Sequence, residues 1–307
     1  MVVGFDVIGA PLNQFGSVCS EDNPAQALRR GDGGLDEWLA IRRQRWGADI
    51  RDCGDVAPSA EVSEYLAAGD KLAALDAYSA QLKAALLDSF SQGRRPITIG
   101  GDHAIAVASL QAVLQHFQVE RGEKVALVWV DAHADCNDDP EGNLHGKPLT
   151  MLMNRWPKWQ IDPELALRPE QLFYVGVRDI GPNELATISE HAISWLTMSQ
   201  IEEQGIAAAT QGLLQRLEQD FDHIYLSFDY DALDGAIFRA CATPDIGGLS
   251  AREALYMVSK LTASEKFIGA EFVEYLPERD VNGVSHELKV KLIDTAMGFG
   301  PLAVKAK

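Results

Sequence analysis

Three short clusters of acidic residues and histidines carry the chemistry that this sequence suggests. Each cluster follows an apolar run typical of a buried strand, and the clusters read Gly-Gly-Asp-His at 100–103, Asp-Ala-His-Ala-Asp at 131–135 and Asp-Tyr-Asp at 229–231. Side chains two residues apart in an extended segment lie on the same side of it. We therefore expect carboxylates and imidazoles to meet in one crevice, from His103, Asp131, His133, Asp135, Asp229 and Asp231.

These side chains together predict bound metal. Carboxylates that converge without a cation repel one another unless some of them are protonated. Mostly oxygen donors with two imidazoles and no thiolate fit a pair of divalent ions, and manganese suits this set better than zinc or magnesium. Two ions about 3.5–4 Å apart can ionise one water between them. Each motif alone is common, since Gly-Gly-Asp-His also forms helix caps, and only their combination at strand ends is informative.

Short apolar runs alternate with segments of helical periodicity along most of the chain. The predicted strands are Val2–Gly9, Ile97–Ile99, Lys124–Val130, Gln171–Val177, Ile193–Trp195, His223–Phe228 and Lys266–Phe272. The predicted helices are Ser63–Ser89, Ala104–Phe117, Met198–Leu217, Ala251–Leu261 and Glu287–Ala296. This alternation predicts one α/β domain over residues 1–307, a three-layer, doubly wound and mostly parallel sheet. Residues 10–60 are expected to form an irregular segment with some helix. Such sheets bind ligands beyond the carboxyl ends of their strands, where the clusters lie.

Composition excludes several classes of partner. The 307 residues include 45 acidic and 27 basic side chains, a formal net charge of −18, which argues against binding to nucleic acid or to an anionic membrane. No run approaches the roughly 18 apolar residues of a membrane span, and we see no leader pattern at the first methionine. The four cysteines are scattered without metal-like spacing, so we expect a cytoplasmic protein.

In these motifs the sequence resembles the ureohydrolase family of arginases and agmatinases, and the arginases in particular. The family's blocks read GGDH, DAHxD and SFDxDxLD, and they stand here at 100–103, 131–135 and 227–234. The resemblance covers roughly residues 95–280 and includes Gly-Asn-Leu-His-Gly at 142–146. It implies a binuclear manganese enzyme whose bridging hydroxide attacks a guanidinium carbon, so that urea and an amine leave.

The resemblance also implies a role for each site residue. His103, Asp131, Asp135 and Asp229 would hold one ion, and Asp131, His133, Asp229 and Asp231 the other. The catalytic residues would be Asp135 as proton donor to the leaving amine, His145 as proton shuttle and Glu274 as the carboxylate that pairs with the guanidinium. The substrate would be bound by Asn137, Glu141, Thr243 and Glu184.

Two departures from the arginase pattern leave the substrate open. Glu141 replaces a serine that contacts the α-carboxylate, and Gly181 replaces an aspartate that receives the α-amino group. We expect a small cationic guanidino substrate, arginine first, with agmatine or a guanidino acid as alternatives. A deacetylase-like amide hydrolase and a non-catalytic metal-binding regulatory subunit are the other possibilities. The family further implies a homo-oligomer, a trimer or a hexamer.

Overall fold

The computed structural model describes residues 4–20, 22–31 and 33–300. A single sheet of eight strands has the order β2-β1-β3-β8-β7-β4-β5-β6, and every pairing is parallel. The strands are β1 (Phe5–Ala10), β2 (Ile50–Asp55), β3 (Arg95–Gly100), β4 (Val125–Val130), β5 (Leu172–Val175), β6 (Ser194–Leu196), β7 (His223–Asp229) and β8 (Phe267–Val273). The predicted α/β class with a parallel sheet is confirmed.

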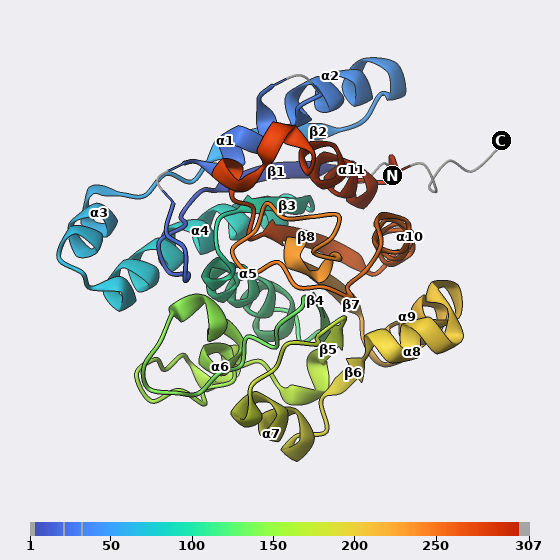
Figure 1. Cartoon of the computed structure of the whole chain (residues 1–307). Helices are drawn as coiled ribbons and strands as arrows, with labels where there is room; N and C mark the ends of the chain where they lie inside the picture. Colours follow the sequence, from blue (N-terminus) through green and yellow to red (C-terminus); the bar gives the residue numbers. More distant parts are fainter. Residues whose placement is uncertain (1–3, 21, 32, 301–307) are drawn as a thin grey trace.

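Helices cover both faces of the sheet (Figure 1). One face packs against α3 (Ala60–Ala67), α4 (Lys71–Ser91), α5 (Ala106–Val113), α6 (Pro148–Leu152) and α7 (Pro182–Glu190). The other packs against α1 (Pro24–Arg29), α2 (Leu35–Trp46), α8 (Met198–Gln204), α9 (Ile206–Asp220), α10 (Ala251–Thr262) and α11 (His286–Ala296).

Strand β4 shows why its sequence lacks polar alternation. All six of its residues are buried. Leu127 and Trp129 pack into the core on the α4–α5 side, whereas Val128 and Val130 pack into the core on the α9–α10 side. A strand covered on both faces must be apolar at every position. The three layers therefore follow directly from this run of sequence.

Three predictions of local structure were wrong. Strand β2 lies inside the segment 10–60 that we expect to be irregular, because this edge strand is exposed along most of its length and carries charged residues. The predicted helix Ser63–Ser89 is two helices, α3 and α4, since Gly69 takes a positive φ of 77° between them. Gly205, with a φ of 78°, likewise divides the predicted helix Met198–Leu217 into α8 and α9.

Two expectations reach past the described residues. The predicted strand Val2–Gly9 begins at residues 2–3, and the predicted domain 1–307 includes residues 301–307, all of which lie outside the described part of the chain. Among the described residues, none of the helices has the length and apolar character that crossing a membrane requires.

Candidate active site

The predicted site residues gather at the carboxyl ends of four neighbouring strands. Strands β3, β8, β7 and β4 stand side by side in the sheet. His103 follows β3, Glu274 follows β8, Asp231 follows β7 and Asp131 follows β4. The chain leaves β3 for β4 across two intervening strands, and such a crossing opens a crevice at the sheet edge. Sheet order therefore brings together residues that lie far apart in the sequence.

His103 is fully buried and faces three carboxylates. Its Nδ1 lies 3.1 Å from Asp131 Oδ2 and 3.2 Å from both Asp135 Oδ2 and Asp229 Oδ2. Its other ring nitrogen, Nε2, lies 2.8 Å from Ser227 Oγ. The ring also stacks on Trp129 with centroids 3.9 Å apart, which fixes its plane.

The tautomer of His103 follows from its neighbours. The Ser227 hydroxyl donates its proton to Glu271 Oε1 at 2.8 Å, so it accepts from His103 Nε2–H. The neutral ring then directs the Nδ1 lone pair at the three carboxylates, and Nδ1 has no hydrogen-bond partner among the described residues. Lone pairs that converge in this way are stabilised by a cation, and a hydrogen bond on the far nitrogen is typical of a metal-ligating histidine. These donors fit a divalent metal.

A second group of donors adjoins the first. His133 Nδ1 lies 3.1 Å from Asp231 Oδ2 and 3.5 Å from Asp131 Oδ1. Asp131 therefore touches both imidazoles, one with each of its oxygens. Ligand atoms of His103, Asp131 and Asp229 lie within 4.8 Å of one another, as do those of Asp131, His133 and Asp231. The arrangement suits two ions that share Asp131.

Without a metal ion, protons bound to the carboxylates and imidazoles offset the negative charge of this cluster. Burial, and then the charge of Asp131, raises the pKa of Asp135 to about 7. Burial also raises the pKa of Glu274 to about 7. Burial opposes protonation of His103, but the carboxylates around its ring outweigh it and raise the pKa of this histidine well above its usual value. Divalent ions would replace these protons.

Asp135 and Glu274 both hold an unusual backbone conformation. Their φ angles are 47° and 67°, in the left-handed region that non-glycine residues seldom adopt. The Glu274 amide donates to Gly101 O at 2.7 Å, and its Oε1 accepts from the His103 amide at 2.8 Å. Strained backbone at buried acidic residues is typical of functional positions.

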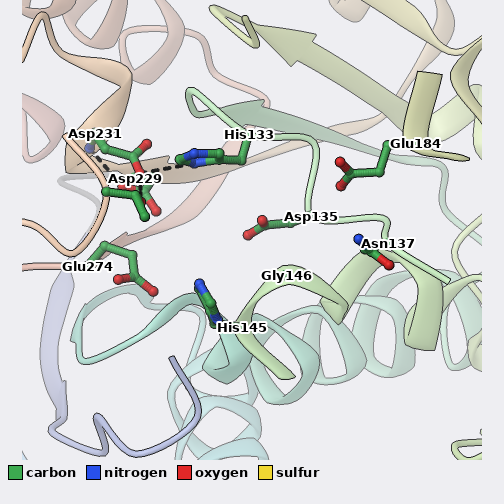
Figure 2. A pocket seen from close by; sticks show the side chains of 10 residues that line it. His133, Asp135, Asn137, His145, Gly146, Glu184, Asp229, Asp231 and Glu274 are labelled. Carbon is green, nitrogen blue, oxygen red and sulfur yellow. Dashed lines mark hydrogen bonds and ion pairs between the residues drawn. The ribbon is translucent and has the colours of Figure 1, made fainter. Parts of the chain in front are cut away.

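These groups border a cavity of about 170 Å³ (Figure 2). Nine of its lining residues have side chains, and all nine are site residues that the sequence predicts. The lining residues are His133, Asp135, Asn137, His145, Gly146, Glu184, Asp229, Asp231, Thr243 and Glu274. His103 and Asp131 lie fully buried beneath them.

Of the remaining predicted residues, Thr243, His145 and Glu184 lie at the cavity wall, and Glu141 does not. Thr243 Oγ1 donates to Asp231 Oδ2 at 3.0 Å. The buried His145 Nδ1 has no hydrogen-bond partner in the part of the chain that the structure describes. The carboxylate of Glu184 accepts from the Gly181 amide at 2.9 Å and so caps helix α7. Glu141 lies apart from this group: its side chain is 86% exposed, lies 3.3 Å from Lys158 and is not among the described residues that line the cavity.

Sequence reasoning missed the residues that orient the ligands. Ser227 and Glu271 are fully buried and fix the His103 ring. Arg178 donates to the backbone carbonyls of Asp231 at 2.9 Å and Asp245 at 3.0 Å, and so holds the segment after β7. A polar residue within an otherwise apolar strand was the available signal for Ser227 and Glu271.

Comparisons with known proteins agree with this geometry. The model of the arginase family matches residues 4–298. An arginase of Staphylococcus aureus (strain MRSA252) is 29% identical over 304 residues, which cover 96% of this chain and 97% of that protein. The crystal structure of arginase from Bacillus subtilis subsp. subtilis str. 168 superposes with a TM-score of 0.82 at 26% identity, covering 96% of this chain and 98% of that one.

The same fold also serves other named activities. Formimidoylglutamase from Bacillus subtilis subsp. subtilis str. 168 has a TM-score of 0.77 at 22% identity, with 98% of this chain and 88% of that one covered. The shared fold therefore does not identify the substrate. The match over nearly the whole chain, together with the gathering of its motifs at one edge of the sheet, confirms the resemblance: this chain belongs to the arginase family.

Proposed function

We propose that the protein hydrolyses a guanidino substrate to urea and an amine, with two Mn²⁺ ions held by His103, Asp131, His133, Asp135, Asp229 and Asp231. The observation that carries the proposal is the geometry of His103, whose Nδ1 faces three carboxylates while its Nε2 is tied to Ser227. When bound, divalent ions supply a nucleophilic hydroxide near neutral pH. The full set of six donors supports two ions rather than the single zinc of a deacetylase-like site.

The cavity residues divide the remaining work by charge. Glu274 would pair with the planar guanidinium, since this buried carboxylate borders the cavity. Asp135 would donate a proton to the leaving amine, since its side chain borders the cavity beside the proposed metal ions. His145 would carry protons between the cavity and solvent. Thr243, Asn137 and Glu184 would position the substrate.

Arginine is the first substrate to test, because the curated relatives over the whole chain are named arginases. One observation favours agmatine as the second candidate. Among the described residues, no lysine or arginine lines the cavity to pair with a substrate carboxylate, whereas Glu184 lies at its wall. The Glu184 carboxylate would repel the carboxylate of arginine but not agmatine, which has none. A guanidino acid is the third member of this set. The family resemblance further supports a trimeric or hexameric assembly in the cytoplasm.

The decisive experiment measures urea release by protein purified without chelator and supplied with Mn²⁺. The panel contains arginine, agmatine, guanidinobutyrate and guanidinopropionate. We expect turnover of at least one member and two metal ions per chain. Absence of urea with every member would refute the hydrolase proposal, and a protein that holds one zinc ion or no metal would refute the binuclear centre.

A further inference from the structure

The loop between the metal cluster and His145 is closed at its base. We call residues 137–147 the rim segment, because it begins at Asn137 on the cavity wall and ends at Lys147, just after Gly146. The Asn137 amide donates to Gly146 O at 3.1 Å, and the Leu149 amide donates to Asp135 O at 3.1 Å. These bonds fix the base of the loop but leave its outer residues, 138–143, to be held by other contacts.

Asn137 is oriented by two donors. Its Oδ1 accepts from the Asp139 amide at 2.8 Å and from Asn183 Nδ2 at 3.1 Å. Both bonds occupy the oxygen, so the Asn137 Nδ2 group remains free to donate. Figure 2 shows this nitrogen on the side of Asn137 nearer the cavity. The rim therefore presents an N–H donor to whatever occupies the outer cavity.

Lys147 holds the carbonyl of Asp139, the residue whose backbone N–H donates to Asn137. Only 2% of Lys147 is exposed, and its Nζ donates to Asp139 O at 2.6 Å. The ammonium also lies 5.3 Å from the centre of the Trp156 ring. Burial lowers its pKa. Within the described chain no carboxylate oxygen comes within 4.0 Å of this nitrogen, so a buried cation is directed at a single backbone carbonyl.

A buried, unpaired ammonium is costly, and lysine is seldom fully buried without a partner. Lys158 offers a contrast on the outer side of the same loop. Its Nζ donates to Pro140 O at 2.7 Å and lies 3.3 Å from Glu141, but its side chain is 47% exposed. Water can replace the contacts of Lys158, whereas nothing replaces those of Lys147.

We propose that Lys147 is a positioning residue for the substrate tail, the end of the molecule remote from the guanidinium. Its ammonium holds the Asp139 carbonyl and so fixes the position of this residue, the Asp139 N–H donates to Asn137 Oδ1, and Asn137 Nδ2 then donates into the outer cavity. The inference rests on the proposed hydrolysis of a guanidino substrate. It assigns Lys147 to tail binding, separate from the metal cluster, for a tail that carries a hydrogen-bond acceptor, as the tail of arginine does and that of agmatine does not.

The test compares Lys147→Met, which keeps the apolar stem against Trp156, with Lys158→Met as the matched control. We expect K147M to raise KM for the best substrate about tenfold while kcat stays within threefold, the loss expected for one hydrogen bond from a charged group. K158M should change KM by less than threefold. A fall of kcat with no change of KM, or equal effects of the two variants, would overturn the proposal.

A double-mutant cycle separates positioning from general damage. If Lys147 acts through Asn137, the pair N137A/K147M binds no more weakly than N137A alone, whereas additive losses would contradict the route through Asn137. Should K147M fail to fold, as judged by circular dichroism, Lys147→Gln carries the same cycle, since its shorter neutral side chain also lacks the ammonium.

Hydrogen exchange gives a readout that does not depend on turnover. Amide exchange over residues 138–143 should be at least tenfold faster in K147M than in either the wild type or K158M. If the wild type releases no urea from any substrate, the proposed function fails, and the exchange result still decides whether Lys147 holds the rim. Equal exchange in all three proteins would overturn that role.

Discussion

The inner and outer ends of the cavity are built in different ways. The inner end consists of side chains at or just after the carboxyl ends of central strands, where hydrogen bonds such as that from Ser227 to Glu271 leave little freedom. The outer end consists of the rim segment and the start of helix α7, where the buried Lys147 holds the loop and the half-exposed Lys158 contacts only its outer side. The difference teaches that chemistry and substrate choice can change separately: the strands fix the proposed metal ligands, and the rim would meet the substrate tail.

The largest effect is expected when one of the proposed metal ligands at the inner end is removed. Asp229→Ala should lower turnover on the order of 10³-fold or more, because a lost ligand removes metal and with it the nucleophile. Metal content, measured by plasma emission spectroscopy beside urea release, checks the cause. Asp138→Ala on the exposed rim is the control and should keep both ions. A D229A protein with full metal content and normal turnover would show that the cluster is misassigned.

Glu274 tests whether metal binding and guanidinium binding are separate functions of the inner end. Glu274→Gln keeps an oxygen for the His103 amide but loses the negative charge. We expect retained metal and a fall in kcat/KM on the order of 10–100-fold, the value of a charge-assisted hydrogen bond. Titration with a guanidinium inhibitor should show the same loss. Near-native kcat/KM would place the guanidinium elsewhere.

The inner end also predicts how stability depends on pH and metal. Without metal, the pKa values of Asp135 and Glu274 are raised to about 7, so the folded protein keeps protons that the unfolded chain releases near pH 4. Their contribution to stability is complete below pH 4 and is lost as the pH rises to 7. His103 and His133 also have raised pKa values, and their contribution is lost above the unfolded value of about 6.5.

We therefore expect the Tm of chelated protein to fall by at least about 3 °C between pH 5 and pH 8, the shift that roughly 2 kcal/mol produces in a domain of this size. Added Mn²⁺ replaces the protons, so its gain in Tm should grow over the same range. Calorimetry with chelator or with metal checks both. A metal-dependent gain that is equal at the two pH values would contradict proton displacement at this cluster.

The inner end was predictable from sequence for a physical reason. Strands covered on both faces are continuously apolar, so β4 and β7 were recognisable, and acidic residues directly after them stood out. Parallel strands share one carboxyl edge, which places Asp131 near Asp229 without any knowledge of the loops. Strand β2 escaped the same reasoning because an exposed edge strand has no such apolar pattern.

The outer end was not predictable because loop side chains take their positions from distant partners. A lysine in a polar loop is expected at the surface, yet Lys147 is buried, with its ammonium against the Trp156 ring and the Asp139 carbonyl. The two donors on Asn137 come from separate segments, one of them Asn183 on α7. No local pattern encodes these contacts, so alignment with a family motif places a rim residue in the chain but not in space.

Glu141 gives the comparison its finest test, because the smallest effect is expected there. The family motif places it beside the substrate, but its side chain is 86% exposed and lies 3.3 Å from Lys158. An exposed ion pair contributes about 0–1 kcal/mol, so Glu141→Gln should leave kcat and KM within about twofold for both arginine and agmatine. Steady-state urea release checks this. If E141Q instead changes the preference between the two substrates by tenfold or more, Glu141 must reach the substrate tail. The rim segment would then close over bound substrate, and the outer end would bind the tail by moving and not in the conformation that the structure shows.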